Sequence, residues 1–205
     1  MHRFALFAIA CTAACGRIGF DERVGLVDGS TTGSDDGAII GGDTGSDGSG
    51  GTGSFGSTEI GISSQNTGQD RVWITRFSLI EPAMVQTIVA HFGVQGGQGA
   101  TVRGVVYADS ANEPAALLAR TDEVALAAGA APSWVTLAFA SPLVLQPGAY
   151  WLGTHNGSSI SLQYQSTMGA TKFAGDLYSD GTAATYAVGT TTFAMQISIY
   201  AEYLR

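Results

Sequence analysis

The sequence predicts an all-β protein: a single antiparallel β-sandwich of the jelly-roll type, preceded by a disordered linker. Three observations support this fold class. Apolar residues alternate with polar ones in several short runs, turn-forming residues separate the runs, and 45% of the residues are hydrophobic. A period of two gives a strand one buried face and one solvated face. Short strands joined by turns are typical of sandwiches and jelly rolls.

The alternation is clearest near the end of the chain. Over residues 193–203, Phe193, Met195, Ile197, Ile199 and Tyr203 share one face, which predicts one half-buried strand. The other predicted strands cover residues 60–64, 72–80, 85–94, 101–108, 133–140, 150–155 and 159–165. Glycine, proline and asparagine punctuate these runs, as at Gly96-Gly97, Pro132, Pro147-Gly148 and Asn156-Gly157. Alanine and leucine in residues 114–128 also allow a helical turn or two.

The N-terminus has the order of a secretory signal. A basic start at His2 and Arg3 precedes a short apolar run, and small residues then lead to Cys15. The run is too short for a stable transmembrane helix. We therefore expect residues 1–14 to be a signal peptide and residues 15–27 to be the mature N-terminal segment.

Small residues followed by cysteine resemble the bacterial lipobox, and Cys-Gly-Arg-Ile-Gly-Phe-Asp is similar to the mature start of myxobacterial lipoproteins. The resemblance implies lipidation of Cys15 and a membrane anchor, with Cys11 as a second possible site. Gly16 stands where an aspartate would favour inner-membrane retention, which points to the outer membrane or cell surface. An ordinary signal peptide would instead leave a periplasmic or secreted protein.

The composition of residues 28–57 is typical of a flexible linker. Gly, Ser, Thr and Asp make up 26 of these 30 residues, and Lys and Arg are absent. Such a segment has too little apolar surface to offset the entropy of ordering it. We therefore predict a flexible Gly/Ser/Thr/Asp-rich linker over 28–57 and a folded β-sandwich domain over 58–205.

Part of the domain resembles a β-sandwich accessory module found on bacterial secreted, surface and phage proteins. The similarity covers about residues 70–155. It lies in Tyr107-Ala-Asp109, Pro114, Leu117-Leu118, Trp134 and the run Gly148-Ala-Tyr-Trp-Leu152. It implies a sandwich fold and an extracellular setting, and it implies no particular binding residues.

Charge and motifs narrow the function classes. The net charge of −8 does not favour nucleic acid, which needs a basic patch. The sequence has no metal-binding His or Cys spacing, no Gly-x-Ser-x-Gly elbow and no phosphate-binding loop. We therefore expect a protein that is not an enzyme, with a small secreted hydrolase as the less favoured alternative.

Exposed aromatic residues are the candidate ligand contacts, because a sugar ring can stack on an aromatic plane. Trp134 alternates out of phase with the apolar positions of its strand, which predicts that it is exposed. Tyr178 and Tyr186 lie in a polar stretch and are the second choice, whereas Trp73 and Trp151 are expected in the core. The expected ligand is a polysaccharide. The alternative is a structural or assembly role in the envelope with a protein partner.

No organic cofactor is expected, but structural calcium is possible. Asp109, Asn112 and Glu113 could supply oxygen ligands, as could Asp176 with Asp180. The alternative is that these side chains accept hydrogen bonds from backbone amides in turns.

Overall fold

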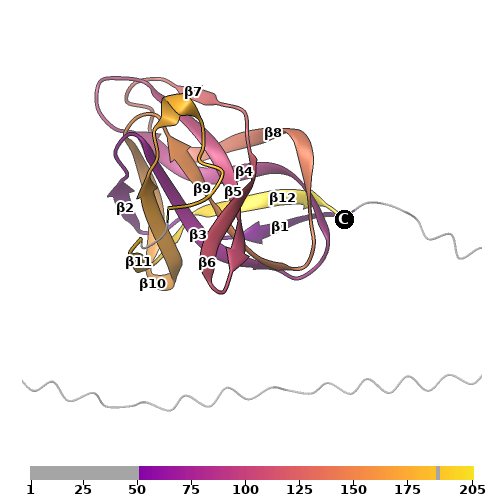
Figure 1. The fold of residues 1–205 in the computed structure, drawn as a ribbon. Coiled ribbons are helices and arrows are strands. Elements are labelled where there is room, and N and C mark those ends of the chain that lie inside the picture. The colour runs from indigo at the N-terminus through magenta and orange to yellow at the C-terminus, as the bar shows by residue number, and fades with distance from the viewer. Residues whose placement is uncertain (1–50, 188–189) are drawn as a thin grey trace, which may run out of the picture. The chain divides into compact units, whose positions relative to one another are not determined.

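The computed structural model describes residues 51–187 and 190–205, which form one antiparallel β unit (Figure 1). This confirms the predicted fold class. The strands are β1 (Thr52–Gly56), β2 (Ser63–Asn66), β3 (Arg71–Leu79), β4 (Ala83–Val94), β5 (Ala100–Ser110), β6 (Glu113–Arg120), β7 (Val124–Leu126), β8 (Ser133–Leu145), β9 (Gly148–Asn156), β10 (Ile160–Gly175), β11 (Thr192–Ile197) and β12 (Ile199–Leu204). Within the described part, the only helical segment is the short 3-10 helix η1 (Tyr178–Asp180). Residues 1–50, which include Cys15, lie outside the described residues.

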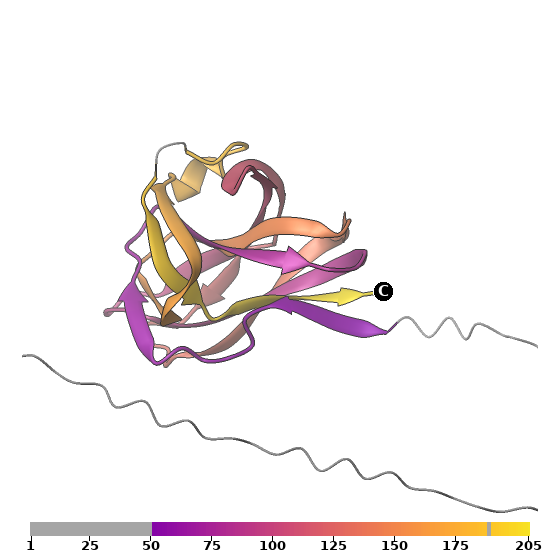
Figure 2. The same cartoon turned by 90° about the horizontal axis from the view of Figure 1, so that it is seen from below.

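The strands form a continuous hydrogen-bonded path in the order β1-β12-β4-β10-β3-β9-β5-β6. The long strand β10 divides this path, because its first half pairs with β4 and its second half pairs with β3. We call β1, β12, β4 and β8 the first layer, and β3, β9, β5 and β6 the second layer. Figure 2 shows the C-terminal strand β12 beside β1 at one edge of the first layer.

The main core combines residues of both layers. Val85, Ile88 and Ala90 of β4 belong to the same buried cluster as Val106 of β5 and Leu152 of β9. All five residues are inaccessible to solvent. Burying an aliphatic side chain of this kind stabilises a fold by about 1.5–3 kcal/mol. These strands therefore supply buried contacts that hold the two layers together.

A second buried cluster lies on the other side of the second layer. It consists of Val72, Ile74, Val105, Tyr107, Trp151, Ala174 and Tyr186. The segment that follows β10 covers this side, since Leu117 N–H donates to the Ala184 carbonyl and the Tyr107 hydroxyl donates to the Ala183 carbonyl. β3 and β9 are therefore buried on both faces, and the predicted core positions of Trp73 and Trp151 are confirmed.

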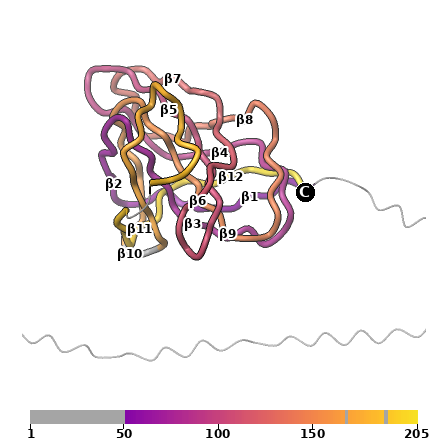
Figure 3. Tube along the Cα trace, in the orientation of Figure 1, coloured from indigo at the N-terminus to yellow at the C-terminus, as the bar shows by residue number. Residues whose placement is uncertain are grey.

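The predicted end of the linker is wrong. Thr52–Gly56 form the edge strand β1, in full register with β12 from Thr52↔Leu204 to Gly56↔Tyr200. Phe55 is the reason, because its ring is buried and packs 6.3 Å from the ring of Tyr203. Figure 3 shows the trace of β1 running beside β12 near the C-terminus. The described domain thus begins before residue 58.

Two further expectations need correction. Residues 114–128 have no helical turn, because β6 pairs with β5 and also carries an isolated bridge from Ala116 to Thr185. The predicted strand over 193–203 is two strands, separated at Ser198. β11 pairs with β10, whereas β12 pairs with β4 and β1. The alternation itself holds across the break, since Met195, Ile197 and Ile199 all enter the main core.

Candidate ligand-binding face

The outward face of the first layer brings polar and aromatic side chains together from four strands. The register places Ser54 of β1, Glu202 of β12 and Thr87 of β4 in one row across the sheet. A second row contains Tyr200 of β12, Val89 of β4 and Thr136 of β8, and His91 and Trp134 form the next pair. We call this surface the outer face of the first layer.

Trp134 lies on the face that its sequence pattern predicted, but it is half-buried and not exposed as expected. Its indole is half-buried because it packs edge-on against two other rings. The ring centroids lie 5.1 Å from His91, with an interplanar angle of 81°, and 5.3 Å from Tyr200, with an angle of 69°. Edge-to-face pairs of this geometry are favourable. They hold Trp134 and Tyr200 in fixed orientations, and both rings remain partly accessible to a ligand.

A groove of about 570 Å³ lies beside Tyr200. Polar and apolar atoms line it in similar shares, and β1, β4 and β12 each contribute a part. The lining residues are Thr52, Gly53, Ser54, Thr58, Gln86, Thr87, Tyr200, Glu202, Tyr203 and Leu204. Thr87 Oγ1 donates a hydrogen bond of 2.9 Å to Glu202 Oε2, which orients the carboxylate. A groove of mixed polarity beside the ring of Tyr200 suits a ligand that has both hydroxyl groups and apolar faces, as a sugar does.

Electrostatics at this face depend on Glu202. Burial and then the negative charge of Glu202 raise the pKa of the Tyr200 phenol above its ordinary value of 10.0, so the hydroxyl, which is protonated at neutral pH in any case, stays a hydrogen-bond donor to more alkaline pH. Burial lowers the pKa of His91, whose Nδ1 has no hydrogen-bond partner among the described residues. The imidazole is therefore held neutral beneath Trp134.

His91 should make the stability of the domain depend on pH. Because burial lowers its pKa below the ordinary value of 6.5, the unfolded chain binds the proton more readily than the folded one. The stabilisation is complete above pH 6.5 and declines as the pH falls below that value, until the folded imidazole is itself protonated. We expect urea unfolding to show a lower free energy of unfolding at about pH 5.5 than at about pH 7.5.

A His91→Phe variant keeps a ring beside Trp134 but cannot titrate, and its stability should change less over the same interval. The carboxyl of Asp109 also has a lowered pKa, but its ordinary value of 3.8 places its effect at more acidic pH. An equal loss of stability in the variant and the native chain would show that His91 is not responsible.

Tyr178 and Tyr186 are not exposed, which corrects the expectation on which their predicted ligand contact depended. Tyr178 is 8% exposed and Tyr186 is 3% exposed. The Tyr178 ring lies 4.1 Å below the guanidinium of Arg103 and 4.8 Å from the ring of His155. Tyr186 packs edge-on against Tyr107 at 5.4 Å. Burial raises the pKa of Tyr178 to about 12. Both tyrosines hold the covering segment onto the second layer.

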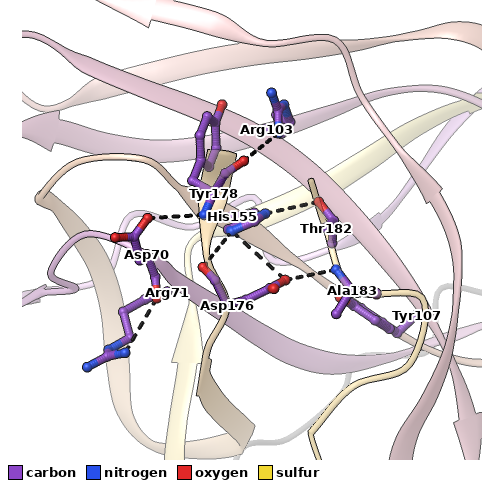
Figure 4. A network of polar contacts seen from close by, with 9 residues as sticks. All are labelled: Asp70, Arg71, Arg103, Tyr107, His155, Asp176, Tyr178, Thr182 and Ala183. Atoms are coloured by element: carbon purple, nitrogen blue, oxygen red, sulfur yellow. Dashed lines mark hydrogen bonds and ion pairs between the residues drawn. The ribbon is translucent and has the colours of Figure 1, made fainter. Parts of the chain in front are cut away.

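A polar network fastens the same segment (Figure 4). His155 is fully buried, and its ring nitrogens lie 3.0 Å from Thr182 Oγ1 and 3.0 Å from the Asp176 carbonyl oxygen. The Asp176 carboxylate accepts a hydrogen bond of 2.9 Å from Ala183 N–H, and Asp70 accepts one of 3.0 Å from Tyr178 N–H. These contacts give Asp176, one of the candidate calcium ligands, a structural role in the turn.

Two of the other candidate calcium ligands, Asp109 and Glu113, are paired with basic side chains, and Asp180 is exposed on η1. Asp109 forms an ion pair with Arg76 at 2.7 Å and accepts a hydrogen bond of 2.9 Å from Trp151 Nε1. These two donors lower the pKa of Asp109. Glu113 pairs with Lys172 at 2.8 Å, and Asn112 donates its backbone N–H to Asp109. Within residues 51–187 and 190–205, no group of three or more His, Cys, Asp or Glu is placed to hold a metal ion.

The sequence singled out only Trp134 on this face. Tyr200 could have been found from it, because Tyr200 has the same parity as Glu202 in an alternating strand whose odd positions are apolar. His91, Gln86 and Ser54 gave no such signal. They join the site only through the pairing of β1, β12 and β4.

No family model and no curated protein matches this chain. Among the described residues, no helix is both long enough and apolar enough to span a membrane. The predicted lipidation at Cys15 and the alternative at Cys11 lie outside the described residues.

Proposed function

We propose that the protein binds a polysaccharide outside the cell through the outer face of the first layer. One observation carries this proposal: the half-buried rings of Trp134 and Tyr200 pack together beside a groove that offers both polar and apolar groups. The apolar face of a sugar ring can cover an aromatic plane, while its hydroxyl groups pair with Gln86, Thr87 and Ser54. In this proposal the aromatic pair supplies contact area and the groove supplies orientation.

The proposed role is binding without catalysis. Among the residues that line the groove, Glu202 is the one carboxylate. Glycoside hydrolysis generally uses a pair of carboxyl groups that flank the scissile bond. The small-hydrolase alternative therefore lacks a second acid among the residues that line this groove.

The proposed setting is the cell envelope. The signal-like N-terminus and Cys15 suggest a lipid anchor, with Gly16 favouring the outer membrane or cell surface. Two or more acyl chains would hold the protein firmly, because each buried methylene contributes about 0.8 kcal/mol. A glycine-rich tether before β1 would then present the domain to extracellular polysaccharide.

A glycan array tests the proposal. The native domain should bind a defined group of polysaccharides, and Trp134→Ala and Tyr200→Ala should each weaken that binding about tenfold or more, as truncation of a central aromatic contact usually does. Leu118→Ala is the matched control, because Leu118 is an exposed apolar residue of β6 in the second layer. Unchanged melting temperatures would show that the variants remain folded.

The proposal would be contradicted if the domain bound no glycan, or if neither aromatic substitution changed its affinity. A protein partner in the envelope would then be the better candidate. One observation favours that second function: Leu204, Met84 and Val144 form a cross-strand apolar row on the same face, next to the groove that Leu204 also lines. Val144 is 67% exposed there.

A further inference from the structure

We propose that the groove of the first layer prefers sugars that carry a free amine over their N-acetylated counterparts, and that it rejects acidic polysaccharides. This inference rests on the proposed function and adds the charge class of the ligand. It follows from the distribution of charged side chains between the two layers.

The basic residues of the described part avoid the groove. Arg71, Arg76, Arg103, Arg120 and Lys172 all lie on strands β3, β5, β6 and β10. The four strands of the first layer contain no Lys or Arg. Arg205 directly follows β12, but its guanidinium is paired with Glu81 at 2.8 Å. Proteins hold carboxylate and sulfate groups mainly through Arg and Lys, so this face lacks the groups that would bind an acidic sugar.

Glu202 gives the groove a negative charge. Its carboxylate is exposed and forms no ion pair within the described residues. Thr87 donates to Oε2, which leaves Oε1 able to accept from a ligand. A carboxylate can accept a hydrogen bond from a neutral hydroxyl, but its bond to an ammonium group is stronger.

The charge of Glu202 also acts at the aromatic platform. It contributes, after burial, to the raised pKa of the Tyr200 phenol, two residues away on the same face of β12. An ammonium group on a sugar stacked over Tyr200 would lie near both the Glu202 carboxylate and the Tyr200 ring. Both kinds of group attract a cation. A uronate at the same place would meet repulsion from Glu202 and no compensating cation.

Three oligosaccharides of equal length test the inference: glucosamine, N-acetylglucosamine and galacturonate oligomers, titrated calorimetrically into the full domain. The glucosamine oligomer should bind about two- to fivefold more tightly than its N-acetylated counterpart at low salt, the scale expected for an exposed ion pair. The difference should shrink at high salt, because screening weakens exposed charge pairs. The galacturonate oligomer should bind most weakly.

Glu202→Gln is the decisive variant, because glutamine keeps an oxygen that can accept from Thr87 but carries no charge. It should abolish the preference for the amine, whereas Asp180→Asn, an exposed carboxylate on η1, should retain it. Equal binding of the amine and N-acetyl forms, tight binding of galacturonate, or a preference unchanged in Glu202→Gln would overturn the inference and leave glycan binding intact. Failure of all three oligomers to bind would also overturn the inference, whereas the proposed function would be overturned only by binding to no glycan on the array.

Discussion

A chain that begins at Thr58 should be less stable than one that begins at Gly51 and should lose its glycan binding. The shorter chain lacks β1, so it loses the buried ring of Phe55 and exposes the edge of β12. Loss of a buried aromatic side chain costs about 3–5 kcal/mol in a protein core. The same deletion removes Thr52 and Ser54 from the wall of the groove. Urea unfolding and calorimetric titration of both chains measure the two effects.

Phe55→Ala in the longer chain separates stability from binding. This variant should lose most of the same stability, because Phe55 contributes the buried contacts of β1. The folded variant should still bind glycan, because Phe55 points into the core whereas Thr52 and Ser54 point outward. Equal free energies of unfolding for the two chain lengths would contradict the assignment of β1 to the domain.

Trp151→Ala should be the most damaging single substitution outside the main core. The side chain of Trp151 is completely buried between β9 and the covering segment, and its Nε1–H donates to Asp109. Removing a buried tryptophan costs about 3–5 kcal/mol. The Asp109 carboxylate would also lose one of its donors, although Arg76 would remain. Thermal unfolding should show a markedly lower melting temperature.

Two comparisons sharpen this test. Trp151→Phe keeps most of the ring volume but loses the hydrogen bond to Asp109. It should therefore lower the free energy of unfolding by less than Trp151→Ala, which also leaves a cavity. Trp134→Ala should lower the free energy of unfolding least of the three, because Trp134 is half-buried on an outer face. A larger loss of stability in Trp134→Ala than in Trp151→Ala would contradict the placement of these two residues.

Local alternation was enough to place many side chains. The period of two put Leu137 in the core and Trp134 on the opposite face, as the structure confirms. It also predicted the inward positions of β11 and β12, although it could not show that they are separate strands. A strand that changes partners at Ser198 keeps its own alternation, so the change leaves no trace in the pattern.

Errors arose where long-range contacts override local composition. Tyr178 and Tyr186 lie in a polar stretch that reads as a loop, yet the segment folds back and buries both rings against the second layer. The alanine-rich run after Pro114 is a strand because β5 supplies its hydrogen-bond partners. Phe55 alone, in a glycine-rich segment, gave no periodic signal that β1 would join β12.

The sequence by itself determined the all-β class and the face of its strand on which Trp134 lies. These properties depend on residue type and on a period of two within each strand. Only the tertiary structure decided that Ser54, Glu202 and Thr87 share one row, that Tyr200 meets Trp134, and that a groove lies beside them. Strand order and register set those contacts through backbone hydrogen bonds between segments far apart in the chain, and no local pattern specifies which edges will pair.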